Sequence, residues 1–237
     1  MKDLTIDRIG SYTASRELNK SLIVSEVELV LDKDRNIYGI TKRIIDLIVS
    51  SVFIVFFMPL WLLISLVIKA TSRGEVFYKP ELIGLDGKKF AMYKFRTMYH
   101  DCDTSPHQIL TQKIINDNGS TQKLENDIRI TPLGKFLRKF SIDEFPQLIN
   151  VIKGEMSLVG PRPCIEYEYK LMKNWHRQRV RVLPGMTGIW QINGRNGAKF
   201  NDLILMDLEY IKKRSLKFDL LILLKTIPVV IFGRGGG

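Results

Sequence analysis

The chain has 237 residues, with 36 lysines and arginines against 25 aspartates and glutamates, which gives a formal net charge of +11. Apolar residues make up 45% and charged residues 26%, a balance that supplies a hydrophobic core and excludes a disordered or collagen-like chain. Two cysteines exclude a disulfide scaffold, and the positive charge indicates an anionic partner: nucleic acid, an acidic membrane surface or a phosphorylated substrate.

The first 40 residues are polar and mixed in character. Residues 24–32 alternate somewhat like a strand, but we interpret residues 1–40 as a polar N-terminal extension.

An apolar segment follows and predicts a membrane anchor over residues 41–70. Residues 47–68 are 22 consecutive residues without a charge, and a straight helix of that length would measure about 33 Å, enough to cross a bilayer core. Pro59 lies near the middle of this run. Because proline lacks an N–H, the carbonyl of Val55 loses its helical partner and the helix kinks or breaks there.

Both flanks of the anchor are basic, with Lys42 and Arg43 before it and Lys69 and Arg73 after it. Since basic flanks stay in the cytoplasm, these residues favour a re-entrant helix–break–helix that enters and leaves by one face. A plain single span and a buried, kinked helix of a soluble core are the alternatives. The backbone freed at the break needs a partner from a nearby hydroxyl, such as that of Ser50, Ser51 or Ser65.

Residues 71–237 are expected to form the domain that follows the anchor. Residues 75–98 predict two short strands around a turn at residues 84–87. Residues 100–126 are rich in polar side chains and predict a mobile surface loop. Residues 131–157 indicate a helix, a break and a second helix.

The last third of the chain is mainly helical in pattern. A rigid turn is expected at residues 160–163, helical spacing at 165–183, and a glycine-rich loop at 184–197 whose Ile-Trp-Gln-Ile is strand-like. Residues 200–215 predict an amphipathic helix. Residues 216–232 predict an apolar helix lying on or partly in the membrane face, with a buried helix as the alternative.

Asp143 and Glu144 form the most informative pair of side chains. Because Pro146 is well tolerated only in the first turn of a helix, both carboxylates are expected at a helix N-terminus. Ser141 and Glu144 also have the spacing of a capping box. The positive end of the helix would lower the pKa of Asp143 and keep it ionised.

An ionised carboxylate can attack phosphorus and form an acyl phosphate. Its repulsion from the phosphate must be offset by cations, for which Arg129, Arg138 and Arg162 lie nearby in sequence and Mg²⁺ suits an oxygen-only site. The simpler interpretation is that the two acids only cap a helix.

Five motifs in order resemble those of the bacterial sugar transferases, the monotopic polyprenyl-phosphate phosphoglycosyl transferases. The match covers roughly residues 40–235. The motifs are Lys94–Met98 (KFRTM), Asp127–Arg138 (DIRITPLGKFLR), Ser141–Gln147 (SIDEFPQ), Gly154–Pro163 (GEMSLVGPRP) and Pro184–Gln191 (PGMTGIWQ).

The resemblance implies a mixed α/β, mainly helical enzyme with a re-entrant anchor and interfacial amphipathic helices, at the cytoplasmic face of the bacterial inner membrane. It would transfer a phospho-sugar from a UDP-sugar to undecaprenyl phosphate and release UMP, the first membrane step of capsule, exopolysaccharide or O-antigen assembly. The family anchor breaks at a Ser-Pro pair, whereas this chain has Met58-Pro59. Long members carry additional N-terminal membrane helices, so this chain is expected to be a short form or part of a longer one.

The resemblance also implies residue roles. Asp143 would be the nucleophile and a Mg²⁺ ligand, and Glu144 a supporting acid–base or metal-organising residue. Phosphate contacts are implied for Lys94, Arg96, Arg138 and Arg162.

Three functions are the alternatives to this one: a glycosyltransferase that releases UDP, a non-catalytic basic membrane adaptor, and a nucleic-acid binder. The last leaves the apolar run unexplained and lacks a basic platform interleaved with aromatic residues, so no nucleic acid is expected as a partner. The sequence leaves open the sugar, the pathway and the oligomeric state, a homo-oligomer included.

Overall fold

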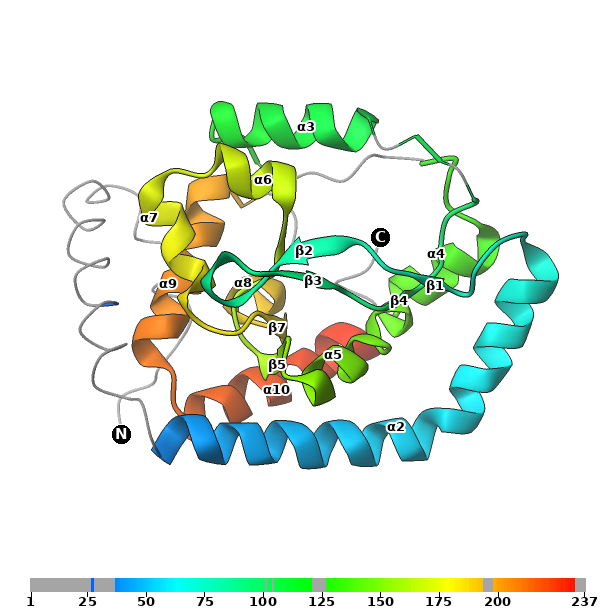
Figure 1. Ribbon diagram of the computed structural model, residues 1–237, viewed down its shortest axis with the longest axis horizontal. Helices are drawn as coiled ribbons and strands as arrows, with labels where there is room; N and C mark the ends of the chain where they lie inside the picture. Colours follow the sequence, from blue (N-terminus) through cyan, green and yellow to red (C-terminus); the bar gives the residue numbers. More distant parts are fainter. Residues whose placement is uncertain are drawn as a thin grey trace.

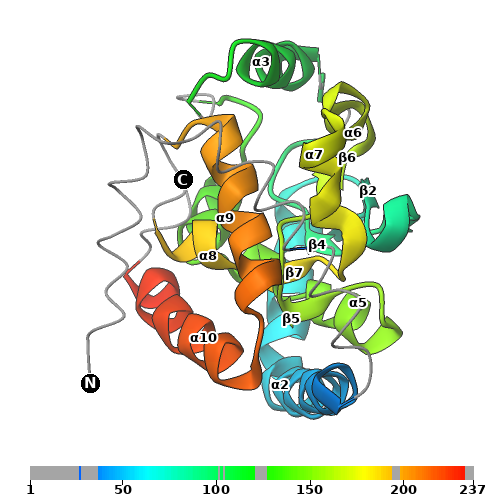
Figure 2. The ribbon, with the colours of Figure 1, turned by 90° about the vertical axis from the view of Figure 1, so that its left-hand side faces the viewer.

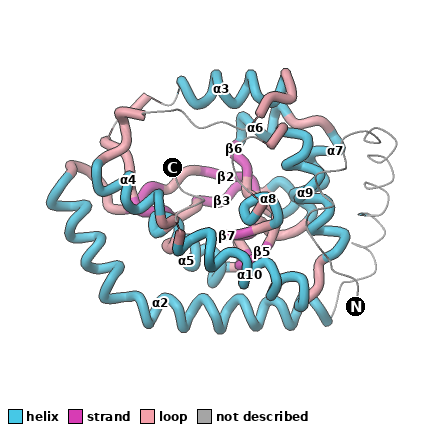
Figure 3. The backbone as a smooth tube through the Cα atoms, turned by 180° about the vertical axis from the view of Figure 1, so that it is seen from behind, coloured by secondary structure: helices cyan, strands magenta, loops and turns pink. Residues whose placement is uncertain are grey.

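The structure, a computed structural model, describes residue 27 and residues 37–100, 102–103, 105–120, 127–193 and 198–232. Most of the expected N-terminal extension, and all of its strand-like segment except Val27, lie outside these residues. Helices dominate the described part of the chain, as predicted. Figures 1 and 3 show the short strands lying between helix α2 (Ile37–Thr71) on one side and helix α3 (Ser105–Asn116) on the other.

The expected membrane anchor lies within α2, which is one helix throughout despite Pro59. Figure 1 shows its axis turning, so the second half rises at an angle to the first. The helix therefore changes direction along its length and is not broken at Pro59. Ser65 donates a 2.7 Å hydrogen bond to the carbonyl of Trp61, one turn back in its own helix. It therefore does not serve Val55, the carbonyl that Pro59 frees.

Most of the surface of α2 is not covered by protein. Only 17% of its most apolar window is buried, and Val55, Phe56 and Leu66 are each about two-thirds exposed or more. A core helix of a soluble protein would be covered on all sides, so this exposure argues against that alternative. Among the described residues, α2 is also the one helix long and apolar enough to cross a membrane.

The first turns of α2 are fixed to the rest of the chain by polar contacts. Arg43 donates to the carbonyl oxygens of Val151 and, at 2.7 Å, Ile152. Asp46 is 3% exposed, and its carboxylate accepts from the hydroxyl of Ser157 at 2.7 Å and from the amide of Leu158 at 3.2 Å. These bonds attach the start of α2 to α5 and β5.

We expect Asp46→Ala to lower the free energy of unfolding by about 1–3 kcal/mol, because the Ser157 hydroxyl and the Leu158 amide both lose their buried acceptor. Thermal unfolding of the detergent-solubilised protein measures this, with the exposed Asp117→Ala as the matched control. An unfolding temperature equal to that of the control would contradict the role given to Asp46.

The predicted hairpin is confirmed. Strands β2 (Glu81–Ile83) and β3 (Lys89–Ala91) pair antiparallel with Leu82 opposite Phe90. The 3-10 turn η2 (Leu85–Gly87) joins them with φ values of +53° at Asp86 and +78° at Gly87, which aspartate and glycine tolerate. The flanking strands β1 (Phe77–Tyr78) and β4 (Lys94–Phe95) pair with each other.

The prediction of a mobile loop over residues 100–126 is wrong for a large part of that segment, because α3 occupies twelve of its residues. Its sequence is mostly polar and gives little helical signal. The helix packs against α6 (Glu166–Leu171), where the imidazole Nδ1 of His107 lies 2.5 Å from the hydroxyl of Tyr167. Tertiary packing therefore stabilises a helix that local composition does not predict.

The helix–break–helix over residues 131–157 is confirmed as α4 (Pro132–Lys139) and α5 (Gln147–Lys153), with the 3-10 turn η3 (Ile142–Glu144) between them. The helical pattern of residues 165–183 divides into α6, α7 (Asn174–Arg177) and the 3-10 turn η4 (Gln178–Arg181).

Two further pairings complete the described sheets. β6 (Cys164–Ile165) extends the β2–β3 sheet, and β5 (Ser157–Val159) pairs parallel with β7 (Gly185–Thr187). Gly185 is required here, since a Cβ on it would lie 2.0 Å from the amide nitrogen of Gly160.

The expected strand at Ile-Trp-Gln-Ile is wrong: these residues form helix α8 (Ile189–Ile192). The strand of this region lies just before it, at β7. Burial of Trp190 and packing of α8 against α9 (Phe200–Lys213) outweigh the β-propensity of the two isoleucines.

The amphipathic helix predicted at residues 200–215 is confirmed as α9, whose buried face supplies Leu203, Ile204, Leu208 and Ile211 to the core. The last helix, α10 (Leu216–Ile231), buries Asp219 and Ile222 and leaves Leu220, Leu224 and Ile227 more than half exposed. It is thus not the fully buried helix of the alternative.

Candidate active site

The two acidic residues lie in the 3-10 turn η3, not in the first turn of α5. Ser141 has φ +54° and makes no side-chain capping bond, so the predicted capping box is absent. Pro146 occupies the N-cap position of α5, whose first helical residue is Gln147. The turn is closed by a 3.2 Å bond from the amide of Glu144 to the carbonyl of Ser141.

Asp143 is 7% exposed, and its surroundings raise the pKa of its carboxyl group. Burial raises the pKa of Asp143 above its usual range, whereas Lys94 and Arg138 lower it and the Glu144 carboxylate raises it again. The predicted lowering by a helix N-terminus is therefore wrong, because desolvation outweighs the favourable charges.

Lys94 and Arg138 are the two cations that the fold brings to this carboxylate. Lys94, on β4, forms a 3.0 Å ion pair with Glu144. Arg138, in the last turn of α4, donates from Nε to the hydroxyl of Thr97 at 2.9 Å. Burial lowers the pKa of Arg138, and the nearby Asp143 opposes that shift. The result is a buried acid between two cations.

Close packing of α4 positions Arg138. The hydroxyl of Thr131 caps this helix by accepting from the amide of Gly134 at 2.9 Å. A Cβ on Gly134 would lie 2.1 Å from the carbonyl oxygen of Thr97, so only glycine allows α4 to approach that segment. This contact brings the KFRTM and LGKFLR motifs together.

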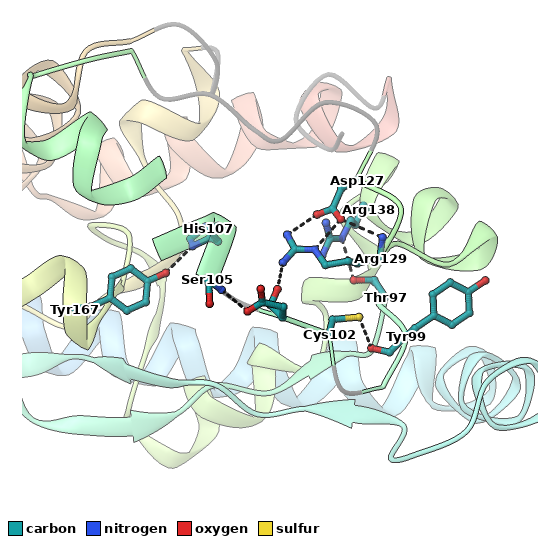
Figure 4. A network of polar contacts seen from close by, with 10 residues as sticks. Thr97, Tyr99, Cys102, Ser105, His107, Asp127, Arg129, Arg138 and Tyr167 are labelled. Atoms are coloured by element: carbon teal, nitrogen blue, oxygen red, sulfur yellow. Dashed lines mark hydrogen bonds and ion pairs between the residues drawn. The ribbon is translucent and has the colours of Figure 1, made fainter. Parts of the chain in front are cut away.

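Arg129 lies close to Arg138 and is bound by the carboxylate of Asp127 (Figure 4). Its Nη2 is 2.7 Å from Asp127 Oδ2 and its Nε donates to Oδ1 at 2.8 Å. Arg129 also donates to the carbonyl of Asp103. Asp127 therefore orients Arg129, and its own pKa is lowered chiefly by the hydrogen bond from Arg129.

The other two arginines with predicted phosphate contacts make different contacts. Arg96 is 8% exposed and donates to the carbonyl and hydroxyl of Ser72, at 2.9 and 2.8 Å, just after α2 ends. Arg162 is exposed and lies over the ring of Trp190, 5.2 Å from its centre. Of the five predicted basic residues, the structure brings Lys94 and Arg138 to the acidic pair, and Arg129 lies close to Arg138.

Asn150 is a positioning residue that the sequence reasoning missed. It is fully buried on α5, accepts from the amide of Tyr93 at 2.9 Å and donates to the carbonyl of Ala91 at 2.7 Å. These bonds fix the chain immediately before Lys94. The available signal was an amide residue within the otherwise apolar run Leu148–Ile152.

The acidic turn also abuts the anchor helix. The ring of Phe145 lies 5.3 Å from that of Phe53 and 6.2 Å from that of Phe57, both on α2. A shielded carboxylate with two neighbouring cations suits a substrate that carries phosphate, and its position against an exposed apolar helix suits one that is membrane-bound.

Comparisons with known proteins agree with this arrangement. The family model described as bacterial sugar transferase matches residues 37–233. The chain is 42% identical over 203 residues to the exopolysaccharide production protein ExoY of Rhizobium meliloti, covering 85% of this chain and 90% of that protein.

Two longer relatives match over less than half of their own length. One is the undecaprenyl-phosphate galactose phosphotransferase of Salmonella typhimurium, 38% identical over 80% of this chain and 40% of that protein. The other is the UDP-glucose:undecaprenyl-phosphate glucose-1-phosphate transferase of Klebsiella pneumoniae, 38% identical over 78% of this chain and 39% of that protein. The resemblance predicted from five ordered motifs is thus confirmed: the chain belongs to the bacterial sugar transferase family.

Proposed function

We propose that this protein transfers a phospho-sugar from a UDP-sugar to undecaprenyl phosphate and releases UMP, as an initiating step of exopolysaccharide, capsule or O-antigen synthesis. The names of the Salmonella and Klebsiella relatives support the lipid acceptor, and that of the Rhizobium relative supports the pathway class. The observation that carries the proposal is the buried Asp143 carboxylate flanked by Lys94 and Arg138 beside the anchor helix.

The reaction is proposed to proceed in two displacements. An Asp143 carboxylate oxygen attacks the β-phosphorus of the UDP-sugar, and the bond from that phosphorus to the bridging oxygen breaks as UMP leaves. A phosphate oxygen of undecaprenyl phosphate then attacks the aspartyl phospho-sugar, and its P–O bond to Asp143 breaks to regenerate the carboxylate. One small site can serve both substrates in turn, which gives ping-pong kinetics.

The basic residues reduce the repulsion between the carboxylate and the phosphates. Arg138, already oriented by Thr97, lies where it can stabilise charge on the transferred phosphoryl group. Lys94 holds Glu144 and keeps a second positive charge beside Asp143. Arg129, which Asp127 orients, is proposed to contact the nucleotide phosphates.

Mg²⁺ is the proposed cofactor. Asp143 and Glu144 would hold it, and two carboxylates with substrate phosphates match the usual ligands of this ion. Among the described residues there is no cluster of three or more acidic, histidine or cysteine side chains that would form a complete protein cage. When bound, the ion would neutralise phosphate charge.

The re-entrant form of α2 is also a proposal, and contacts at both ends of the helix support it. At its start, Arg43 and Asp46 bind the α5–β5 region. Just beyond its end, Ser72 accepts from Arg96. A straight span would place these ends about 30 Å or more apart across a bilayer, whereas here both bind one domain. The active site would then face the cytoplasm at the headgroup plane of the inner membrane.

The decisive experiment gives the detergent-solubilised protein a panel of UDP-sugars with undecaprenyl phosphate and Mg²⁺. We expect UMP, together with a lipid diphosphate sugar, for at least one sugar. Release of UDP would identify a glycosyltransferase instead, and no product with any sugar would favour a non-catalytic membrane adaptor. The same panel identifies the sugar, which the structure does not specify.

A further inference from the structure

A basic cavity of about 380 Å³ lies away from the acidic turn, at the start of α2. Figure 2 shows this side of the molecule, where the first turns of α2 pass the lower end of α9 and the start of α10. Turn η2, the end of β5 and the segment after η4 complete the wall. Its charged residues are four cations, Lys42, Arg43, Arg181 and Arg214, and two carboxylates, Asp46 and Asp86.

Half of these cations are already engaged in holding the fold. Lys42 forms a 2.7 Å ion pair with Asp219, which also accepts from the hydroxyl of Tyr210 at 2.8 Å. Arg43 binds two backbone carbonyls, and the carboxylate of Asp46 is satisfied by its two donors. These residues make a rigid wall.

Arg181 and Arg214 are different, since neither has a carboxylate partner among the described residues. Arg181 is exposed. Arg214 has its guanidinium 5.9 Å from the ring centre of Tyr38, and its Nε is shielded from solvent without a hydrogen-bond partner. An unpaired buried donor beside a cavity is costly unless a ligand accepts from it.

The outer face of the first turns of α2 is apolar. Ile37 is 83% exposed, and Ile40, Ile44 and Ile48 follow on the same stripe with more than half of each side chain exposed. On the neighbouring helix, Leu220 adds to this surface at the start of α10. The cavity therefore opens beside an apolar surface suited to the hydrocarbon edge of a membrane.

The cavity is separate from the proposed catalytic centre. Its α2 residues end at Asp46, whereas Phe145 beside the acidic pair contacts Phe53 and Phe57. Phe53 lies seven residues after Asp46 on the helix, a rise of about 10 Å. Neither Asp143 nor Glu144 lines the cavity.

We propose that this cavity binds the phosphate headgroup of an anionic membrane phospholipid, held by Arg181 and Arg214. Arginine is suited to phosphate because its planar donors can bind two oxygens at once. The excess of cations favours an anionic lipid over a zwitterionic one. The bound headgroup would fix the start of the anchor at the membrane surface.

The test adds short-chain phosphatidylglycerol to the full-length protein in neutral detergent and follows its unfolding temperature. Short-chain phosphatidylcholine and inorganic phosphate are the comparison ligands. We expect saturable stabilisation by phosphatidylglycerol, and an apparent dissociation constant at least about tenfold weaker in Arg181→Gln/Arg214→Gln. The control Lys113→Gln/Lys199→Gln removes the same charge from two exposed sites outside the cavity, one on α3 and one just before α9, and should bind as the wild type does.

Equal stabilisation of the wild type and the double variant would overturn the proposal. An equal effect of phosphatidylcholine would reject the requirement for an anionic lipid, and an equal effect of inorganic phosphate would identify a site for free anions instead. Should the double variant unfold, Arg181→Gln alone changes an exposed side chain and gives the same comparison. Formation of a covalent adduct at Asp143 from UDP-sugar should be unchanged in these variants, which separates this site from the proposed function.

Discussion

Asp143→Asn is expected to lose at least about 10⁴-fold in turnover and to form no covalent adduct with the phospho-sugar. An amide is a poor nucleophile and carries no negative charge, so the first displacement fails even when the substrate still binds. Intact-protein mass spectrometry after mixing with UDP-sugar alone measures the adduct, and UMP release measures turnover.

Stability distinguishes a loss of chemistry from a loss of fold in this variant. Because burial raises the pKa of Asp143, its ionised form costs folding free energy at neutral pH, and a neutral amide avoids that cost. We expect the unfolding temperature of Asp143→Asn to equal or exceed that of the wild type. Asp117→Asn, at an exposed site, is the matched control with full activity. An adduct or wild-type turnover in Asp143→Asn would exclude the proposed nucleophile.

Arg179→Met is expected to lower the free energy of unfolding by about 3–5 kcal/mol, the largest structural effect of any single change considered. Arg179 and Asp207 are each 1% exposed and form a 2.5 Å ion pair. Arg179 also donates to the carbonyl of Arg162 at 2.7 Å. Without the guanidinium, Asp207 is left as a buried, unpaired charge.

The pH dependence of this loss has a defined sign. Burial raises the pKa of Asp207 to about 6, and Arg179 opposes that shift. Removing Arg179 raises the folded-state pKa further above the unfolded value, so the variant's deficit grows as pH rises through this range. Thermal unfolding should therefore show a smaller difference from wild type at pH 5 than at pH 8.

The double variant Arg179→Met/Asp207→Leu is the control for this pair. It removes both charges together and should recover part of the lost stability, because replacing a buried pair by apolar residues is often nearly neutral. A single variant as stable as the wild type, or a double variant no better than the single one, would contradict the expected cost of an unpaired Asp207.

Several features were predictable from the sequence because their causes are local. The uncharged run 47–68 predicts an exposed apolar helix, and Pro59 predicts its bend. Glycine and aspartate at residues 84–87 predict the hairpin turn, since they tolerate positive φ. The ordered motifs were sufficient to identify the family.

Other features depend on residues that are distant in sequence. Helix α3 and the helix at Ile189–Ile192 form because neighbouring helices pack against them, against their own composition and propensity. Arg96 and Arg138 were alike as candidates for phosphate binding, but the close contact at Gly134 places Arg138 near Asp143, while Arg96 binds Ser72.

The sequence by itself determined the uncharged, apolar character of residues 47–68, the family, and the candidacy of the acidic pair, because each depends on residue type and short spacing. Only the tertiary structure decided the state of that pair. Desolvation depends on what packs around a side chain, so the pKa of Asp143 rises although a helix N-terminus predicts the reverse. The same packing decides which cations reach it.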